Sequence, residues 1–402
     1  KPLLPIGCGG IWVQEQLFLQ ALQWRSWVGA KDFRVLRTGL ATACFLLGTV
    51  PAFAEDSRPG DWTAPEVMEF GDWSVACDNA RECTAVSISR DYVRRISNTD
   101  AGDYASPKLW VKRSAGPKAK PRVYVDTSTW GEVRPVGQLS LHIYYKCDGD
   151  CTGFAYKLSD IEPGRYELIA KQVERFFQES TKTDLAASRF GSGAMHGIIT
   201  TKGLTAAMRF IDEVQERGGS KTAIYAKGTI AASAVPAPPV RDTVHVVRGI
   251  NEPSTEMPDH PEMQRVRGEH CKGPHDPNET NIQRFRLQNG QALWSIICDS
   301  TQRNPTHLWL VETTQEKFDL FKLPRPEQGR NAEMPILPHS WFDPASGQLT
   351  AYSSGDEIGR CGWKRRWAWT GSAFEMIDAV EMPACLDIQI NRWLQTYRAI
   401  PE

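Results

Sequence analysis

Cysteine is the residue type in this chain whose spacing most directly suggests chemistry. Of the 10 cysteines, Cys8 and Cys44 lie before residue 55, and the other eight follow it. These eight occur as close neighbours: Cys77 with Cys83, Cys147 with Cys151, Cys271 with Cys298, and Cys361 with Cys385. Proximity favours these pairs as disulfides, although eight cysteines allow many other pairings. A thioredoxin-like redox pair has little support, since no C-x-x-C motif occurs.

Histidine and serine offer few further candidates for catalysis or metal binding. His270, Cys271 and His275 suggest zinc ligation, but no second ligand pair at zinc spacing follows them. We interpret this group as a disulfide cysteine between solvated histidines. Ser192 lies in a Gly-Ser-Gly sequence that does not match the G-x-S-x-G elbow of hydrolases, and His196 alternates with apolar residues as in a strand.

Acidic pairs and phosphate loops give no better candidate. Asp356 and Glu357 could be the acid and base of a glycosidase, but adjacent residues of a strand point to opposite faces, which favours a solvated turn. No glycine-rich phosphate loop occurs. We therefore predict no catalytic, cofactor-binding or metal-binding residue and no cofactor. A non-enzymatic binding or interaction role is expected, and a hydrolase acting on envelope polymers is the alternative.

An aromatic and cationic sequence, GWKRRWAW, occupies positions 362–369. Trp363, Trp367 and Trp369 with Arg365 could form a platform that binds a glycan or a peptide. Because residues two apart share one face of a strand, Trp367 and Trp369 fit core packing equally well. The partner expected for such a platform is an envelope glycan or a protein.

Basic residues surround the Gly116-Pro117 turn: Lys108, Lys112, Arg113, Lys118, Lys120 and Arg122. They predict a basic hairpin, which either meets anionic headgroups or cell-wall polymers or is a solvated hairpin tip, the interpretation that we favour. The net charge of −1 gives no reason to expect a nucleic-acid partner.

The segment 34–54 predicts export. It has a basic start, an apolar run over 40–50 and an Ala-Phe-Ala ending, which is the pattern of a signal peptide cleaved before Glu55. Its apolar run is shorter than the roughly 20 residues that span a bilayer, so no transmembrane segment is expected. Residues 1–33 are interpreted as an upstream or n-region extension. We expect a periplasmic or secreted bacterial protein, in which disulfides persist.

Two domains and a linker are expected after the signal segment, because the remaining length exceeds what one core usually organises. Residues 62–230 form the first domain and residues 262–402 the second. Prolines interrupt the intervening residues 231–261, which we interpret as an extended, semi-rigid linker.

The expected fold class is α+β. Short alternating runs predict an antiparallel sheet with strands at 70–77, 83–89, 108–113, 122–127 and 139–146. Apolar stripes within 168–177 and 204–214 predict two helices that cover one face, and a strand at 222–227 is expected to return to the sheet. The second domain alternates almost throughout, which predicts a mainly β sandwich or barrel-like meander.

Several motifs carry a family resemblance: FGDWSVACDN at 70–79 with Cys83, GLTAAMRFIDEVQERGGSKTAIYAKG at 203–228, and GRCGWKRRWAWTGSAF at 359–374 with Cys385. The chain resembles the bacterial secreted family called domain of unknown function 1176 over essentially its whole mature length. Its N-terminal half is also similar to the invasion-associated locus B family. Arg360 and the pair Leu386-Asp387 depart from the expected family pattern. The resemblance implies compartment and fold more than chemistry.

Overall fold

A computed structural model describes residues 67–87, 107–127, 139–148, 150–183, 185–190, 194–250, 261–271, 282–300, 304–314, 317–321, 323, 336–386 and 388–402. The predicted signal segment 34–54 and the extension 1–33 lie outside these residues, as do Ser192 and His275. Among the helices that are described, none combines the length and apolar character needed to cross a membrane.

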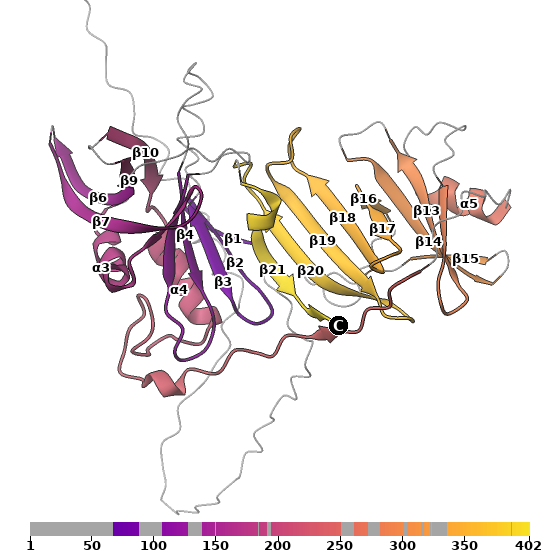
Figure 1. Cartoon of the computed structure of the whole chain (residues 1–402), viewed down its shortest axis with the longest axis horizontal. Coiled ribbons are helices and arrows are strands. Elements are labelled where there is room, and N and C mark those ends of the chain that lie inside the picture. The colour runs from indigo at the N-terminus through magenta and orange to yellow at the C-terminus, as the bar shows by residue number, and fades with distance from the viewer. Residues whose placement is uncertain are drawn as a thin grey trace, which may run out of the picture. The chain divides into compact units, whose positions relative to one another are not determined.

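The N-terminal part is built on an antiparallel sheet of ten strands in the order β1-β2-β3-β4-β5-β8-β7-β6-β9-β10 (Figure 1). Its strands are β1 (Met68–Phe70), β2 (Trp73–Cys77), β3 (Cys83–Ser87), β4 (Lys108–Arg113), β5 (Arg122–Asp126), β6 (Leu139–Asp148), β7 (Asp150–Glu162), β8 (Arg165–Leu168), β9 (Leu185–Phe190) and β10 (Ala194–Thr200). Alternate residues of the central strands, such as Val75, Val111 and Val125, are fully buried. The period-two pattern of the sequence thus places one face of this sheet in the core.

Two helices pack against that buried face. They are α3 (Ala170–Ser180) and α4 (Leu204–Val214), and the second has the bounds that its apolar stripe predicts. Phe176 of α3 and Met208 of α4 have no exposed surface and belong to the same core cluster as the strand valines. Helix α4 follows Gly203, whose φ of 91° suits glycine and whose Cβ, if present, would lie 1.9 Å from the carbonyl oxygen of Phe70.

The predicted strand at 222–227 is wrong. This segment forms turns and bends, because the buried carboxylate of Asp212 accepts the backbone N–H groups that a strand would use. Ile224 N donates to Asp212 Oδ2 at 2.8 Å and Tyr225 N donates to the same atom at 3.1 Å. A side chain of α4 therefore replaces the strand ladder as the hydrogen-bonding partner of this segment.

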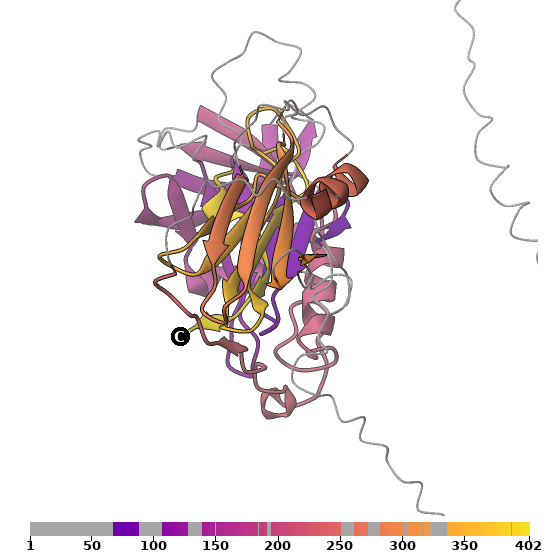
Figure 2. The ribbon, with the colours of Figure 1, turned by 90° about the vertical axis from the view of Figure 1, so that its right-hand side faces the viewer.

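The C-terminal part contains two five-stranded sheets and a short parallel pair. The first sheet holds β12 (Ile282–Arg286), β13 (Ala292–Asp299), β14 (Thr306–Thr314), β15 (Lys317–Leu320) and β16 (Ile336–Pro338), with β16 on β14. The second holds β17 (Trp341–Asp343), β18 (Gln348–Ser354), β19 (Gly362–Trp369), β20 (Phe374–Met382) and β21 (Leu394–Arg398). Helix α5 (Pro261–His270) lies beside the first sheet (Figure 2). Its Met263 and Val266 belong to the core cluster of that sheet. The described chain is thus mostly β, with several sheets.

The segment after residue 231 is partly packed. It contains a short 3-10 turn at Ala232–Ala234 and strand β11 (Thr243–Val244), which pairs in parallel with β22 (Ile400–Pro401). Val244 and Val246 are buried against β19 and β20. Residues 56–402 form one compact unit, and a shared apolar cluster joins Trp110 and Tyr124 of the first sheet to Trp393 near the C-terminus. Residues from both parts of the described chain thus share one apolar cluster, and the division into two domains stays a prediction.

Candidate functional site

Disulfides connect three of the four neighbouring cysteine pairs. Cys77–Cys83, Cys271–Cys298 and Cys361–Cys385 are bonded. Cys147 and Cys151 are directly opposite each other in the register of β6 and β7, and their side chains lie outside the described ones. The first bridge joins neighbouring strands, whereas the bridge between Cys361 and Cys385 fastens the loop before β19 to the segment after β20. That last bridge stands beside a pocket.

The pocket has a volume of about 650 Å³ and is assembled from separate parts of the C-terminal region. Its walls come from the β16–β17 connection, the end of β18, the loop that follows it, and the turn that precedes β21. We call it the Tyr352 pocket and define it by its lining residues: His339, Tyr352, Ser354, Glu357, Ile358, Gly359, Ile388, Gln389, Ile390 and Asn391. A volume of this size is typical of small-molecule sites, which range from about 300 to 1,000 Å³.

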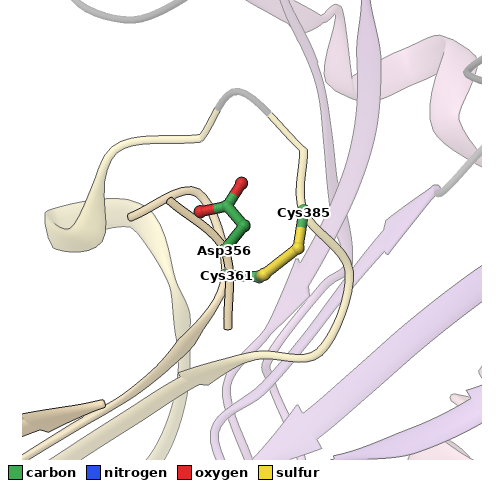
Figure 3. Close-up of side chains that lie close together, drawn as sticks. All are labelled: Asp356, Cys361 and Cys385. Atoms are coloured by element: carbon green, nitrogen blue, oxygen red, sulfur yellow. A yellow bond between two sulfur atoms is a disulfide. The ribbon is translucent and has the colours of Figure 1, made fainter. Parts of the chain in front are cut away.

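An ion pair and a disulfide shape the loop on one side of the pocket. Asp356 accepts the backbone N–H of Arg360 at 2.8 Å and its Nε–H at 2.6 Å. Burial opposes ionisation of Asp356, but the hydrogen bonds and charge of Arg360 prevail and lower its pKa. Figure 3 shows Asp356 beside the bridge of Cys361 and Cys385. Potential ligand atoms of these three residues lie within 4.8 Å of one another, but the sulfurs are consumed by the disulfide, so the group is not a metal site in this state.

Asn304 holds the end of β18 in place. Its Nδ2 donates to the carbonyl of Ser354 at 2.9 Å, and its Oδ1 accepts the N–H of Ser354 at 2.8 Å. One amide side chain thereby replaces a missing ladder partner at the point where the strand meets the pocket. The loop beyond it requires glycine: Gly359 has φ 76°, and a Cβ there would lie 2.7 Å from the hydroxyl of Tyr352.

His339 adopts an uncommon backbone conformation in the pocket wall. Its φ is 34°, and its N–H donates to the carbonyl of Pro305 at 2.7 Å. A non-glycine residue in the left-handed region costs free energy, on the order of 1–3 kcal/mol, and such residues are concentrated at functional sites. The His339 ring lies 6.0 Å from the ring of Tyr352. Behind it, burial and the neighbouring His339 lower the pKa of His307 to about 4, so His307 is neutral at pH 7.

The polar groups of the pocket suit binding better than acyl transfer. Ser354 Oγ donates its hydrogen bond to the carbonyl of Asp356, so its proton is not directed at a histidine. Glu357 is the one carboxylate in the lining, and the lining contains no lysine or arginine. A nucleophile with an aligned base, which hydrolysis requires, is thus not assembled by the described lining residues.

The tryptophan-rich strand contributes to the core. Trp367 and Trp369 are 0% and 2% exposed and pack between the two C-terminal sheets. Trp363 is partly buried, and the guanidinium carbon of Arg365 lies 4.4 Å from the centre of its ring. Trp367 and Trp369 therefore pack inward, and Arg365 is buried as well at 8% exposure, so Trp363 is the one partly exposed residue of the predicted platform.

Several basic side chains of the hairpin are buried or form ion pairs. Arg113 is buried and donates to Asp212 Oδ1 at 3.0 Å, and Lys108 is 3% exposed. Lys112 pairs with Glu82 at 2.7 Å. Arg122 donates to both oxygens of Glu167, each at 2.7 Å. A hollow of about 420 Å³ lies beside it, and it is lined by a mixture of acidic and basic side chains.

Sequence patterns did not identify the Tyr352 pocket. Asp356 and Glu357 were expected in a turn, and they do lie in one, but His339, Tyr352 and the 388–391 turn carried no local signal. The motif at 359–374, which carries the family resemblance, includes Gly359 of the lining but gave no reason to expect a pocket. The pocket arises because sheet pairing brings together segments that are far apart in the chain.

Comparisons with known proteins agree on the family. The chain is 25% identical over 343 residues to the "Uncharacterized protein YpfG" of Escherichia coli (strain K12), which covers 81% of this chain and 90% of the relative. No solved structure matches the chain significantly. Residues 67–400 match the family model described as "Protein of unknown function (DUF1176)", and the chain therefore belongs to that family.

Proposed function

We propose that this protein is an exported, disulfide-stabilised binding protein of the bacterial envelope and that the Tyr352 pocket is its ligand site. The observation that carries the proposal is the pocket itself: apolar side chains, amides and one carboxylate line a single cavity of about 650 Å³. A few convergent polar groups in a largely apolar cavity are typical of ligand sites.

Export is supported by the signal-like segment 34–54 together with the disulfides, which persist in oxidising compartments. The similarity of the N-terminal half to the invasion-associated locus B family stays a prediction, as does the division into domains at residues 231–261. Intact-mass analysis of the protein recovered from the periplasm or medium tests export: the mature chain is expected to begin at Glu55, and a mass that includes residues 34–54 would contradict it.

A hydrolase of envelope polymers, the alternative, finds less support in the pocket. The hydroxyl of Ser354 is directed at a backbone carbonyl. Hydrolysis also needs either an activated nucleophile or two carboxyl groups that face a common bond. Glu357 lines the pocket, whereas its neighbour Asp356 is bound by Arg360 outside the lining.

The test of the proposed site uses a side chain that fills the pocket. Asn391 is exposed in the lining, so Asn391→Trp adds bulk there without disturbing the core. The control, Val240→Trp, adds a tryptophan at a position that is 93% exposed and outside the pocket. Saturation-transfer NMR is recorded with a mixture of soluble cell-wall fragments and each full-length variant.

Wild type and Val240→Trp are expected to transfer saturation to some of the fragments, whereas Asn391→Trp is expected to lose most of that transfer. Equal transfer by all three proteins would show that binding takes place elsewhere. A time-dependent loss of fragments that is abolished by Ser354→Ala would support the hydrolase instead.

A further inference from the structure

We infer that the disulfide of Cys361 and Cys385 is a thiol-operated switch that sets the shape of the Tyr352 pocket. An external dithiol, the chemical group that thiol–disulfide oxidoreductases present, opens the bridge, and reoxidation restores the pocket. The inference names the regulation of the proposed site and so, for ligand binding, rests on the proposed function. It is carried by the position of the bridge between two pocket walls and by the exposure of one of its cysteines.

The bridge ties together two walls of the pocket. Residues 357–359 line the pocket just before Cys361, and residues 388–391 line it just after Cys385. Figure 3 shows the bridge between the loop that carries Asp356 and the segment that contains Cys385. The Cα atoms of the two cysteines are 4.4 Å apart, so the bridge holds the two walls close together.

The strands next to the bridge are paired without it. The ladder of β19 and β20 runs from the Gly362–Met382 pair to the Trp369–Phe374 pair, and the bridge lies just beyond its first end. Trp367 of β19 has no exposed surface and packs in the core between the two C-terminal sheets. Opening the bridge is therefore expected to leave this hairpin and its core intact and to free only the chain beyond the strand ends.

The 388–391 wall is anchored independently of the bridge. Ile388 belongs to the apolar cluster that also contains Trp110 and Tyr124 of the first sheet. The carbonyl of Ile388 accepts the Nε1–H of Trp393 at 3.1 Å, and Trp393 is buried in the same cluster. This wall is thus expected to keep its place when the disulfide is reduced.

The loop before Cys361 is held mainly by bonds within itself. Asp356 accepts the backbone N–H and the Nε–H of Arg360, and Gly355 N donates to the carbonyl of Cys361 at 2.9 Å. These bonds preserve the turn of the loop but do not join it to the anchored wall. Ile358, in the middle of the loop, is 54% exposed. Reduction removes the covalent tie to the anchored wall, so the loop is expected to shift and the pocket to change shape.

Exposure makes this bridge the most accessible of the three that are described. Cys385 is partly exposed. The other five bonded cysteines are at most 7% exposed: Cys77, Cys83, Cys271, Cys298 and Cys361. Thiol–disulfide exchange needs the direct approach of a thiolate to a sulfur, so its rate depends on access. A dithiol is therefore expected to attack Cys385 before it reaches the two buried bridges.

The exchange takes two balanced steps. One thiolate of the dithiol attacks Cys385 Sγ and forms a mixed disulfide, while the bond to Cys361 breaks and the Cys361 thiolate takes up a proton. The second thiolate of the dithiol then attacks the dithiol sulfur of the mixed disulfide and releases Cys385, which is protonated in turn. The bridge gains two electrons and two protons, and the dithiol loses them and becomes a cyclic disulfide.

Timed alkylation of the full-length protein tests which bridge opens. The protein is treated with dithiothreitol, samples are quenched with an alkylating reagent, and peptide mass spectrometry reports the labelled fraction of each cysteine. We expect Cys361 and Cys385 to be labelled at least about tenfold faster than the cysteines of the two buried bridges, because access limits the exchange. Equal rates, or earlier opening of the Cys271–Cys298 bridge, overturn the inference.

Isoleucine-methyl NMR without ligand tests whether opening reshapes the pocket. The variant Cys361→Ser/Cys385→Ser removes the bridge. The matched control, Cys271→Ser/Cys298→Ser, removes a bridge of similar sequence separation, 27 against 24 residues, whose cysteines are outside the pocket lining. We expect the Ile358 methyl signal to shift in the first variant and to stay in place in the control.

Dithiol-treated wild type decides the outcome even where a serine variant does not fold. Its Ile358 signal is expected to shift once Cys361 and Cys385 are labelled and to return on reoxidation. Far-UV circular dichroism shows whether the treated protein keeps its secondary structure. An Ile358 signal that is unchanged after the bridge has opened overturns the inference.

Saturation-transfer NMR with the mixture of soluble cell-wall fragments connects the switch to binding. Oxidised wild type and the control variant are expected to transfer saturation, whereas Cys361→Ser/Cys385→Ser and dithiol-treated wild type are expected to lose most of that transfer. Equal transfer by the oxidised and opened proteins overturns the inference and leaves the proposed site standing. No transfer by any form contradicts the proposed function, while the alkylation rates and the Ile358 signal still decide the switch.

Discussion

The strand pair β18–β19 has two ends with opposite properties. At one end Leu349 faces Trp367 in the register, and both side chains have no exposed surface. At the other end Ser354 faces Gly362, and the chain leaves the sheet to form the wall of the Tyr352 pocket. The same two strands thus supply a closed core and an open cavity. The difference comes from what covers them: the β12–β16 sheet packs over the first end, whereas loops and one disulfide frame the second.

Polar side chains show the same contrast between closed and open sites. Asp212 is fully buried and is saturated by Arg113 and by the N–H groups of Ile224 and Tyr225. Gln389 and Asn391 are exposed, and their amides have no partner among the described residues. Satisfied buried groups stabilise a fold, and available exposed groups can bind a ligand. This distinction predicts which substitutions affect stability and which affect binding.

The largest effect is expected at the closed end of the strand pair. Trp367→Ala should lower the free energy of unfolding by about 3–5 kcal/mol, because it removes a buried aromatic side chain and leaves a cavity. Trp341→Ala is the control, since Trp341 is 49% exposed on the edge strand β17, and its cost should be well below half of that. Urea denaturation measures both. Equal costs would mean that Trp367 is not a core residue in solution.

The buried polar cluster should be nearly as sensitive. Asp212→Asn is expected to cost about 3 kcal/mol, because it removes the one carboxylate that faces the buried guanidinium of Arg113. Burial lowers the pKa of Arg113 to about 10, so this guanidinium still carries its charge at neutral pH. Glu216→Gln, at an exposed pair with Arg81, serves as the control and should cost less than about 1 kcal/mol. A stable Asp212→Asn protein would show that the cluster is not structural.

A smaller, pH-dependent effect is expected behind the pocket. The pKa of His307 is lowered from 6.5 to about 4, so the unfolded chain binds this proton more readily than the folded chain. Neutral His307 makes its full contribution to the free energy of unfolding above pH 6.5, and this contribution is lost as the pH falls toward 4. Between pH 7.5 and 4.5 we expect wild type to lose on the order of 1–2 kcal/mol more than His307→Gln, after allowance for partial exposure. The prediction is wrong if the free energies of unfolding of wild type and His307→Gln change with pH in parallel.

A similarly small stability effect should accompany a change in the pocket. Gly359→Ala is expected to cost about 1–2 kcal/mol and to weaken ligand binding, because the new Cβ meets the Tyr352 hydroxyl and φ is 76°. Gly290→Ala provides a matched control: its φ is 84°, and no atom lies within 4 Å of the added Cβ. The control should show the backbone cost without the loss of binding. If Gly359→Ala binds ligand as well as Gly290→Ala does, the loop around Gly359 is not part of the binding site.

Local patterns predicted elements well where tertiary contacts agree with them. Strand β4 and helix α4 have the bounds expected from alternation and from an apolar stripe. The expected strand at 222–227 failed because Asp212, which lies on α4, takes its backbone donors. Three of the four neighbouring cysteine pairs are bonded, which simple proximity anticipated.

The pocket could not be predicted in the same way. It depends on Asn304, His339 and Tyr352 meeting through the pairing of two sheets, and none of these residues stands in a motif. The positive φ of His339 is only weakly marked: histidine is enriched among the non-glycine residues that adopt a left-handed conformation, but such residues are uncommon overall. Sites built from distant segments become visible only when the register of the strands is known.

Isoleucine-methyl NMR of the full-length protein titrated with the mixture of soluble cell-wall fragments tests the central claim most directly. Ile358, Ile388 and Ile390 line the Tyr352 pocket, whereas Ile143 is fully buried in the N-terminal sheet and serves as the internal reference. We predict that the three pocket methyl signals shift in a saturable manner while that of Ile143 stays in place. Saturable shifts confined to other isoleucines, with the three pocket signals unchanged, would contradict the account.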